Sequence, residues 1–149
     1  MEPFPHVYHA GAKGGVDGLV RLTSPGVPDL DSAGPKAFGG PGDQWSPETM
    51  LVAASADCFI LTFRAVAAAN KFDWQDLEVE ASGTLEKVER EIRFSHIDLK
   101  VRLVVPNEAL VERALRLLEK SEKHCLISSS LRCETKLDAE VRVAGSAAA

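Results

Sequence analysis

The sequence predicts an α+β fold in which strand pairs alternate with single helices, in the order β-β-α-β-β-α-β. Three observations support this prediction. A long apolar helix begins at a well-defined cap, an amphipathic helix comes later in the chain, and most remaining segments alternate between apolar and polar residues as half-buried strands do. Each half of the chain is therefore expected to be a strand pair followed by a helix.

The first strand pair is predicted over residues 6–13 and 16–24, with a glycine-containing turn between the strands. Residues 25–45 follow as a loop rich in proline and glycine. A loop of this length in a compact domain usually has a function or is held in place by a partner.

The first helix is predicted to begin after Ser46 and to run to about Asn70. Ser46 is a favourable N-cap, Pro47 suits the first helical position, and Glu48 favours the positive end of the helix dipole. Apolar side chains lie on almost every side, so we expect a long central helix that is buried nearly all round. Such burial requires a sheet that curls around the helix or a second subunit that covers it.

The second half is predicted to contain an antiparallel strand pair, an amphipathic helix and a final strand. The helix opens at Asn107, ends around residues 120–123 and leads through a turn at 124–130 to the last strand. Residues of one parity are expected to face the core: Leu77, Val79, Ala81, Gly83 and Leu85, then Ile97, Leu99, Val101, Leu103 and Val105, and in the last strand Cys133, Leu137, Ala139, Val141 and Val143.

Length and composition limit the possible partners. The 149 residues suit one domain, predicted over residues 1–144 with a flexible tail at 145–149. A net charge of −5 and a pI near 5.4 argue against nucleic acid and an anionic membrane surface as partners, because both require a basic face.

Asp57 and Arg64 interrupt the apolar run of the first predicted helix, so we interpret it as a buried helix and expect no membrane span. The N-terminus has no secretory signal, and a cytoplasmic location is expected.

Neither a metal site nor another cofactor is expected. His6 and His9 fall on opposite faces of a predicted strand, and His124 is adjacent to Cys125, whereas adjacent residues rarely bind one ion together. The chain also lacks a Cys-x-x-Cys motif, so a zinc ribbon and a thioredoxin-type motif are both absent.

The cysteines are candidates for thiol chemistry, because an odd number without an export signal disfavours structural disulfides. Cys58 lies in the apolar helix beside Asp57, and Cys125 follows the second helix in a polar turn. A reactive Cys58 needs a nearby cation or hydrogen-bond donors, because an apolar setting raises the pKa of a thiol and only the thiolate attacks. The alternatives are a small core side chain for Cys58 and an ordinary surface thiol for Cys125. Cys133 is expected to be structural.

These residues resemble the OsmC/Ohr family, the osmotically induced and organic-hydroperoxide-resistance proteins. The family has an Asn/Ser-Pro-Glu motif and, ten residues after the glutamate, a reactive cysteine in an apolar helix, as in Ser46-Pro47-Glu48 and Cys58. A second family cysteine follows the second helix in a Cys-Pro-x-Ser-like context. Cys125-Leu126-Ile127-Ser128 matches it, with leucine where proline is common. The resemblance covers about residues 6–143.

The resemblance implies a thiol peroxidase. Cys58 would attack a hydroperoxide, most naturally an organic one, Cys125 would then close a disulfide with it, and a dithiol would reduce the pair. The family fold is an intertwined homodimer with its sites at the subunit boundary. That assembly agrees with a central helix too apolar for one subunit to cover.

The chain departs from the family at the arginine that supports the reactive sulfur. Val16 occupies the place of the arginine in a Gly-Gly-Arg-Asp-Gly turn, and Phe38 occupies the alternative place ten residues before the glutamate. Lys36 is the preferred candidate for a substitute cation because it lies in the right loop, and Arg21 and Lys13 are the other candidates. A lysine would act as a point charge rather than as a bidentate fork.

Three further residues complete the predicted site. Glu48 would orient the substitute cation, or would simply stabilise the helix N-terminus. About 15 Å along a straight helix separates Glu48 from Cys58, so a site that uses both needs a bridging cation, a break in the helix or the partner subunit. Phe38 and Trp45 are candidates to line a substrate pocket, although Trp45 would equally serve to fix the loop.

Two other functions remain open on the same scaffold. One is a non-catalytic protein that binds a small apolar ligand at the dimer interface, and an unshifted pKa of Cys58 would favour it. The other is a thiol redox sensor whose disulfide alters partner binding, which predicts rapid oxidation without sustained turnover.

Overall fold

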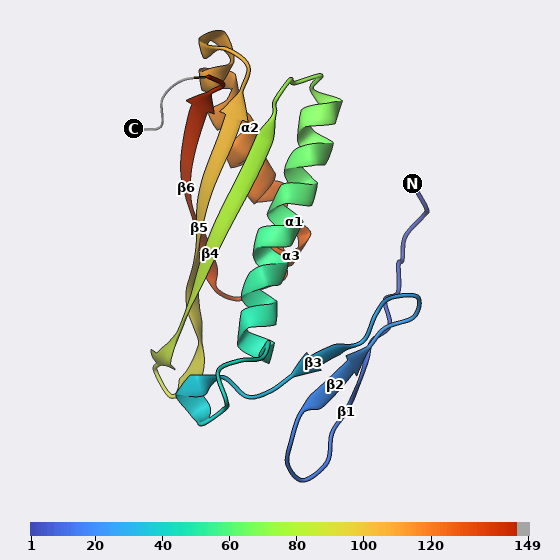
Figure 1. Cartoon of the computed structure of the whole chain (residues 1–149). Coiled ribbons are helices and arrows are strands. Elements are labelled where there is room, and N and C mark those ends of the chain that lie inside the picture. The colour runs from blue at the N-terminus through green and yellow to red at the C-terminus, as the bar shows by residue number, and fades with distance from the viewer. Residues whose placement is uncertain (146–149) are drawn as a thin grey trace. The chain divides into compact units, whose positions relative to one another are not determined.

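The computed structural model describes residues 1–145 and divides the chain into two compact units, residues 1–50 and residues 51–149. Within the described residues each unit contains a three-stranded sheet (Figure 1). The predicted tail at 145–149 lies, apart from Gly145, outside the described residues.

The first unit is built on a small antiparallel sheet in the order β1-β2-β3. Its strands are β1 (Gly11–Lys13), β2 (Val20–Thr23) and β3 (Leu30–Ser32), and the 3-10 helix η1 (Lys36–Phe38) follows. The two predicted strands are therefore shorter than expected, and the predicted loop contains a third strand. Three residues are too few to show an alternating pattern, and the Arg21–Asp31 ion pair, 3.1 Å from Nε to Oδ1, links β2 to β3 through polar side chains.

The first unit has very little apolar core. The buried residues among 1–50 are Ser32, Ala33 and Ser46, whereas Val7, Tyr8, Leu19, Val20 and Leu30 are exposed. A small sheet gains stability from a covered apolar face, and the apolar side chains of this unit are mostly exposed.

Helix α1 (Pro47–Ala69) begins where the sequence predicts. The Thr49 N–H donates to Ser46 Oγ at 3.1 Å, and the Ser46 N–H donates to Thr49 Oγ1 at 2.9 Å. These reciprocal bonds satisfy a backbone donor that the first helical turn leaves without a helical partner. The prediction of Ser46 as the N-cap is confirmed.

Within the chain, only one face of α1 is buried. Its buried residues recur every four positions, at Ser55, Phe59, Phe63 and Ala67, whereas Leu61 is 52% exposed. The sheet of the second unit therefore does not curl around the helix, and cover of its other faces by a second subunit stays a prediction. By length and composition alone, α1 could also cross a membrane; its buried face, however, belongs to the hydrophobic core of the second unit.

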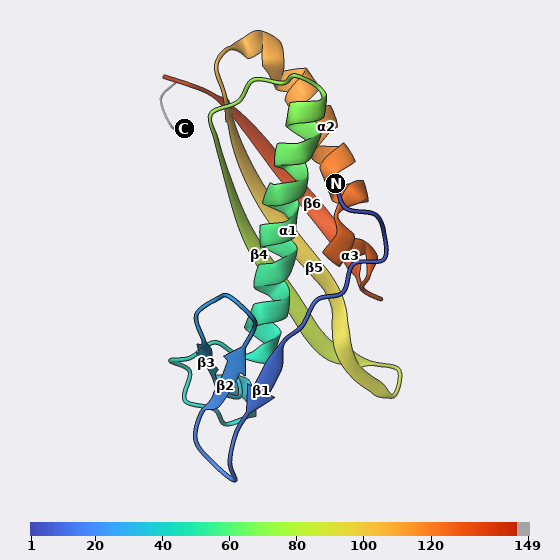
Figure 2. The ribbon, with the colours of Figure 1, turned by 90° about the vertical axis from the view of Figure 1, so that its right-hand side faces the viewer.

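The second unit consists of a sheet in the order β4-β5-β6 with helices on one face (Figures 1 and 2). β4 (Asp76–Val88) and β5 (Glu91–Val105) are antiparallel, and β6 (Glu134–Val143) runs parallel to β5. In this register Leu99 stands between Ala81 and Leu137. The alternation predicted for β5 is confirmed by its buried residues, Ile97, Leu99, Val101, Leu103 and Val105.

The connection from β5 to β6 carries the remaining helices. A 3-10 turn, η2 (Glu108–Leu110), leads into α2 (Val111–His124), whose Ala114, Leu117 and Leu118 join the core. The predicted turn at 124–130 contains the short helix α3 (Leu126–Ser129). Four residues form about one helical turn, which is too short for a periodic pattern to reveal.

Candidate active site

Helix α1 and the α2–α3 junction bring the side chains of Cys58 and Cys125 together. The two thiols are hydrogen-bond partners and both are reduced. Cys58 is half-buried, whereas Cys125 is 0% exposed. The alternative of a surface thiol for Cys125 is therefore wrong. Although the residues around it are polar, the Cys125 side chain itself is buried.

The surroundings of Cys58 favour its thiolate. Burial raises the pKa of Cys58, but hydrogen bonds outweigh it and hold the pKa below the ordinary value of 9.0. The backbone N–H of Ile127 contributes most to the lowering, followed by the Cys125 side chain. The Thr62 hydroxyl, with Oγ1 3.8 Å from the Cys58 sulfur, and the backbone N–H of Leu126 also contribute. Cys58 thus has the hydrogen-bond donors that a reactive thiol needs in an apolar setting.

The surroundings of Cys125 favour its protonated form. Burial raises the pKa of Cys125 above 9.0, hydrogen bonds from Ser128 partly oppose this, and the neighbouring Cys58 raises the pKa further. The pKa values of the two thiols are thus shifted in opposite directions. When Cys58 ionises first, Cys125 keeps a proton that it can donate to the Cys58 sulfur.

The local sequence explains why amide groups face Cys58. Cys125 has an extended backbone (φ −66°, ψ 117°), which ends α2 and caps α3. Ser129 holds α3 closed, because its N–H donates to the Cys125 carbonyl at 3.0 Å and its Oγ donates to the Leu126 carbonyl at 3.1 Å. The first N–H groups of a helix have no carbonyl partner within that helix, so they remain free to bind the sulfur.

The other predicted site residues belong to the first unit, whereas both cysteines belong to the second. Glu48 lies in the first turn of α1, and the unbroken helix places it about 15 Å along the axis from Cys58. One carboxylate oxygen of Glu48 is buried without a hydrogen-bond partner among residues 1–145. Lys36 and Phe38 form the ends of η1, and both are exposed, as is Trp45. No ion pair joins Lys36 to Glu48 in the described part of the chain.

Comparison with known proteins decides the family. Residues 40–140, more than half of the chain, match the family model described as OsmC-like protein. The chain belongs to the OsmC-like family.

Similar OsmC-like proteins include sequence relatives and solved structures. The uncharacterized protein YmaD of Bacillus subtilis (strain 168) is 29% identical over 116 residues, which are 74% of this chain and 77% of that protein. An organic hydroperoxide resistance protein OsmC, predicted redox protein, from Legionella pneumophila is 27% identical, with a TM-score of 0.74 over 95% of this chain and 100% of that one. The OsmC-like protein VCA0330 of unknown function from Vibrio cholerae has a TM-score of 0.84 at 14% identity, covering 91% of this chain and 100% of that one, and shows the fold alone.

Sequence reasoning about this OsmC-like chain missed the donors to Cys58. Thr62 follows Cys58 by four residues, a spacing that places two side chains on the same side of a helix, and this signal could have revealed it. Leu126 and Ile127 act through their backbone, so their residue types carry no such signal. Only the position of α3 reveals them.

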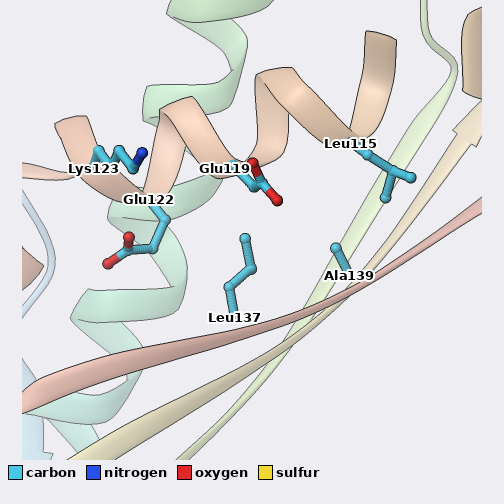
Figure 3. A pocket seen from close by; sticks show the side chains of 6 residues that line it. All are labelled: Leu115, Glu119, Glu122, Lys123, Leu137 and Ala139. Carbon is cyan, nitrogen blue, oxygen red and sulfur yellow. The ribbon is translucent and has the colours of Figure 1, made fainter. Parts of the chain in front are cut away.

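Two cavities of this OsmC-like chain are lined by residues other than the cysteine pair. Figure 3 shows one of about 420 Å³ between α2 and β6, lined by Leu115, Glu119, Glu122, Lys123, Leu137 and Ala139. Another, of about 370 Å³, lies against β4, β5 and β6 among acidic and basic side chains such as Glu80, Lys100 and Asp138. Neither cysteine of the pair is among the described residues that line them. The residues described also contain no cluster of metal-binding side chains.

Proposed function

We propose that this protein is a thiol-dependent peroxidase that reduces hydroperoxides, with Cys58 as the attacking thiol and Cys125 as the resolving thiol. The observation that carries the proposal is the contact between two reduced thiols whose pKa values are shifted in opposite directions. A peroxidase needs a thiolate to attack and a second thiol within reach to complete the reaction. Membership of a family that includes organic hydroperoxide resistance proteins supports an organic hydroperoxide as the substrate.

The reaction proceeds in three balanced steps. The Cys58 thiolate attacks one peroxide oxygen, an S–O bond forms as the O–O bond breaks, and the leaving alkoxide takes a proton to become an alcohol. The sulfur of Cys125 then attacks the Cys58 sulfenic acid, which releases water and forms a disulfide. A dithiol reductant restores both thiols by exchange and is itself oxidised to a disulfide. Such a cycle suits the cytoplasm, where reductants keep thiols reduced.

We further propose that the functional form is a homodimer. The first unit has almost no buried apolar side chains, and α1 leaves Leu61 exposed within an otherwise apolar helix. A second copy of the chain would cover apolar surface that one chain leaves in water. Size-exclusion chromatography with light scattering measures the molar mass in solution. It should give the mass of a dimer for the wild type and a mass shifted toward the monomer for Leu61→Glu. A monomeric wild type would contradict this part of the proposal.

The peroxidase activity is tested by treating the protein with one equivalent of cumene hydroperoxide and measuring its intact mass. The wild type should lose two hydrogens, as a Cys58–Cys125 disulfide requires. Cys125→Ser should instead gain one oxygen that a sulfenic acid reagent traps, and Cys58→Ser should not change. Free thiols in treated wild type would refute the peroxidase and favour a ligand-binding role, and oxidation without turnover on an added dithiol would favour a sensor.

A further inference from the structure

The strand β6 forms one edge of the sheet in the second unit. It is the last strand in the order β4-β5-β6, so β5 is its one strand neighbour among residues 1–145. An edge strand presents a row of backbone N–H and C=O groups that no neighbouring strand binds. Such groups can pair with an extended segment of another molecule, which main-chain hydrogen bonds then hold as an added strand.

The cavity between α2 and β6, called the α2–β6 cavity from here on, offers space for side chains of such a segment. Leu137 and Ala139 are half-buried on the face of β6 that packs against the core. In Figure 3 these two side chains project from β6 toward α2, and Leu115 projects from α2 into the space between them. The cavity of about 420 Å³ therefore has apolar walls on the edge strand and on the helix opposite it.

Two carboxylates border this apolar space. Glu119 and Glu122 extend from α2 toward β6 in Figure 3, and neither forms an ion pair within the part of the chain that the structure describes. Glu122 is half-buried, and a carboxylate that loses water without gaining a partner is destabilised. Lys123 also lines the cavity, so its lining residues carry one net negative charge. The cavity thus favours a cation over an anion.

A lysine or arginine side chain matches this combination of groups. Each has an aliphatic stem that can cover apolar surface and a cationic head that stays at a polar border. The stem would lie against Leu115 and Leu137, and the head would reach the carboxylates of Glu119 and Glu122. A purely apolar side chain would leave both carboxylates without a partner.

We propose that the open edge of β6 and the α2–β6 cavity form a docking site for an extended segment of a partner protein that carries a lysine or arginine. The segment adds to the sheet as a strand beside β6, and its basic side chain enters the cavity. Alternate residues of a strand point to opposite faces, so the cavity reads every second residue of the segment. The site includes neither Cys58 nor Cys125, and it does not depend on the proposed peroxidase.

The test is NMR spectroscopy of the full, reduced chain with four capped seven-residue peptides. The peptides alternate threonine and valine and differ only in the central residue, which is arginine, lysine, leucine or glutamate. The arginine and lysine peptides should shift the amide signals of residues 135–139 and slow hydrogen exchange at every second one, because an added strand bonds alternate residues of its neighbour. The glutamate peptide should bind about tenfold more weakly, because its charge repels the carboxylates.

Two double variants test the carboxylates. Glu119→Gln with Glu122→Gln removes both negative charges of the cavity, and Glu112→Gln with Glu134→Gln is the matched control because it removes two negative charges outside the cavity. The first double variant should weaken binding of the arginine peptide by roughly fivefold to thirtyfold, because two partly exposed ion pairs are lost. The control should bind like the wild type.

Several outcomes would overturn the inference. Unchanged signals of residues 135–139 at millimolar arginine peptide would show that no strand adds to β6, and equal affinities for the arginine and glutamate peptides would show that the cavity does not select a cation. Amide protection that grows with protein concentration without any peptide would assign the edge to a second copy of the chain. If n-butylammonium binds as tightly as the arginine peptide, the cavity takes a small cation without the strand.

Discussion

Gly83 of β4 allows α1 to approach the sheet closely, and a single added methyl group should reveal it. A Cβ at residue 83 would lie 2.6 Å from Val52 Cγ2 and 2.8 Å from Phe94 Cε1. Favourable contacts between carbon atoms lie at about 3.5–4.0 Å, so Gly83→Ala requires a movement of about 1 Å on both sides. The strand backbone itself does not forbid alanine, because Gly83 does not have a positive φ.

Two opposing effects determine how much Gly83→Ala changes the free energy of unfolding. Overpacking of this kind costs about 1–3 kcal/mol, whereas replacing glycine in a strand returns about 0.5–1 kcal/mol by restricting the unfolded chain. Gly83→Ala should therefore lower the free energy of unfolding by about 1–2 kcal/mol. For a chain of this size that corresponds to a fall in Tm of about 2–8 °C.

Urea denaturation and calorimetry of four proteins measure this effect: the wild type, Gly83→Ala, Val52→Ala and the double variant. Val52→Ala removes the methyl group that the new Cβ would meet, so the double variant should recover about 1 kcal/mol relative to the sum of the single changes. A neutral or stabilising Gly83→Ala, or strictly additive variants, would refute the close approach of α1 to β4.

The remaining predictions concern the cap, the core and the thiol. Ser46→Ala removes the hydroxyl that accepts the Thr49 N–H and should cost about 1 kcal/mol in urea denaturation, whereas Ser46→Asp should cost much less. Leu118→Ala, at a position with no exposed surface, should cost about 2–5 kcal/mol, and a loss under 1 kcal/mol would contradict its place in the core. The lowered pKa of Cys58 contributes stability that is present above the ordinary value of 9.0 and is lost as the pH falls through the folded pKa. The Tm of the wild type should therefore rise relative to that of Cys58→Ser as the pH increases from about 6 to 9, and a constant difference would contradict the shift.

The parts of the fold that the sequence predicts well are those determined by neighbouring residues. Ser46 caps α1 through contacts three residues away, and the parity of β5 follows from strict alternation around a buried face. The small elements β3 and α3 escaped prediction because three or four residues cannot display a period. The apolar surface of α1 indicates that cover is needed, but not whether the same chain or a second copy provides it.

The candidate site shows the same division between local and distant information. Cys58 and Cys125 could be predicted as site residues from the sequence. Thr62 could also have been predicted, because residues four positions apart on a helix lie on the same side. The amide donors could not be predicted, because they depend on where α3 meets α1 in space. The separation of Glu48 from Cys58 follows from helix geometry alone, and the unbroken α1 agrees with it.

The parallel pairing of β6 with β5 has a consequence for the order in which this molecule matures. Parallel neighbours cannot be joined by a tight turn, so the chain between Val105 and Glu134 forms a crossover, and Cys125 with its short helix lies within it. Contacts that close such a long loop form late, after the local β4–β5 hairpin. A nascent chain therefore has Cys58 before it has the amide groups that activate it. We expect the pKa of Cys58 to fall below its ordinary value only when α3 packs beside Cys58.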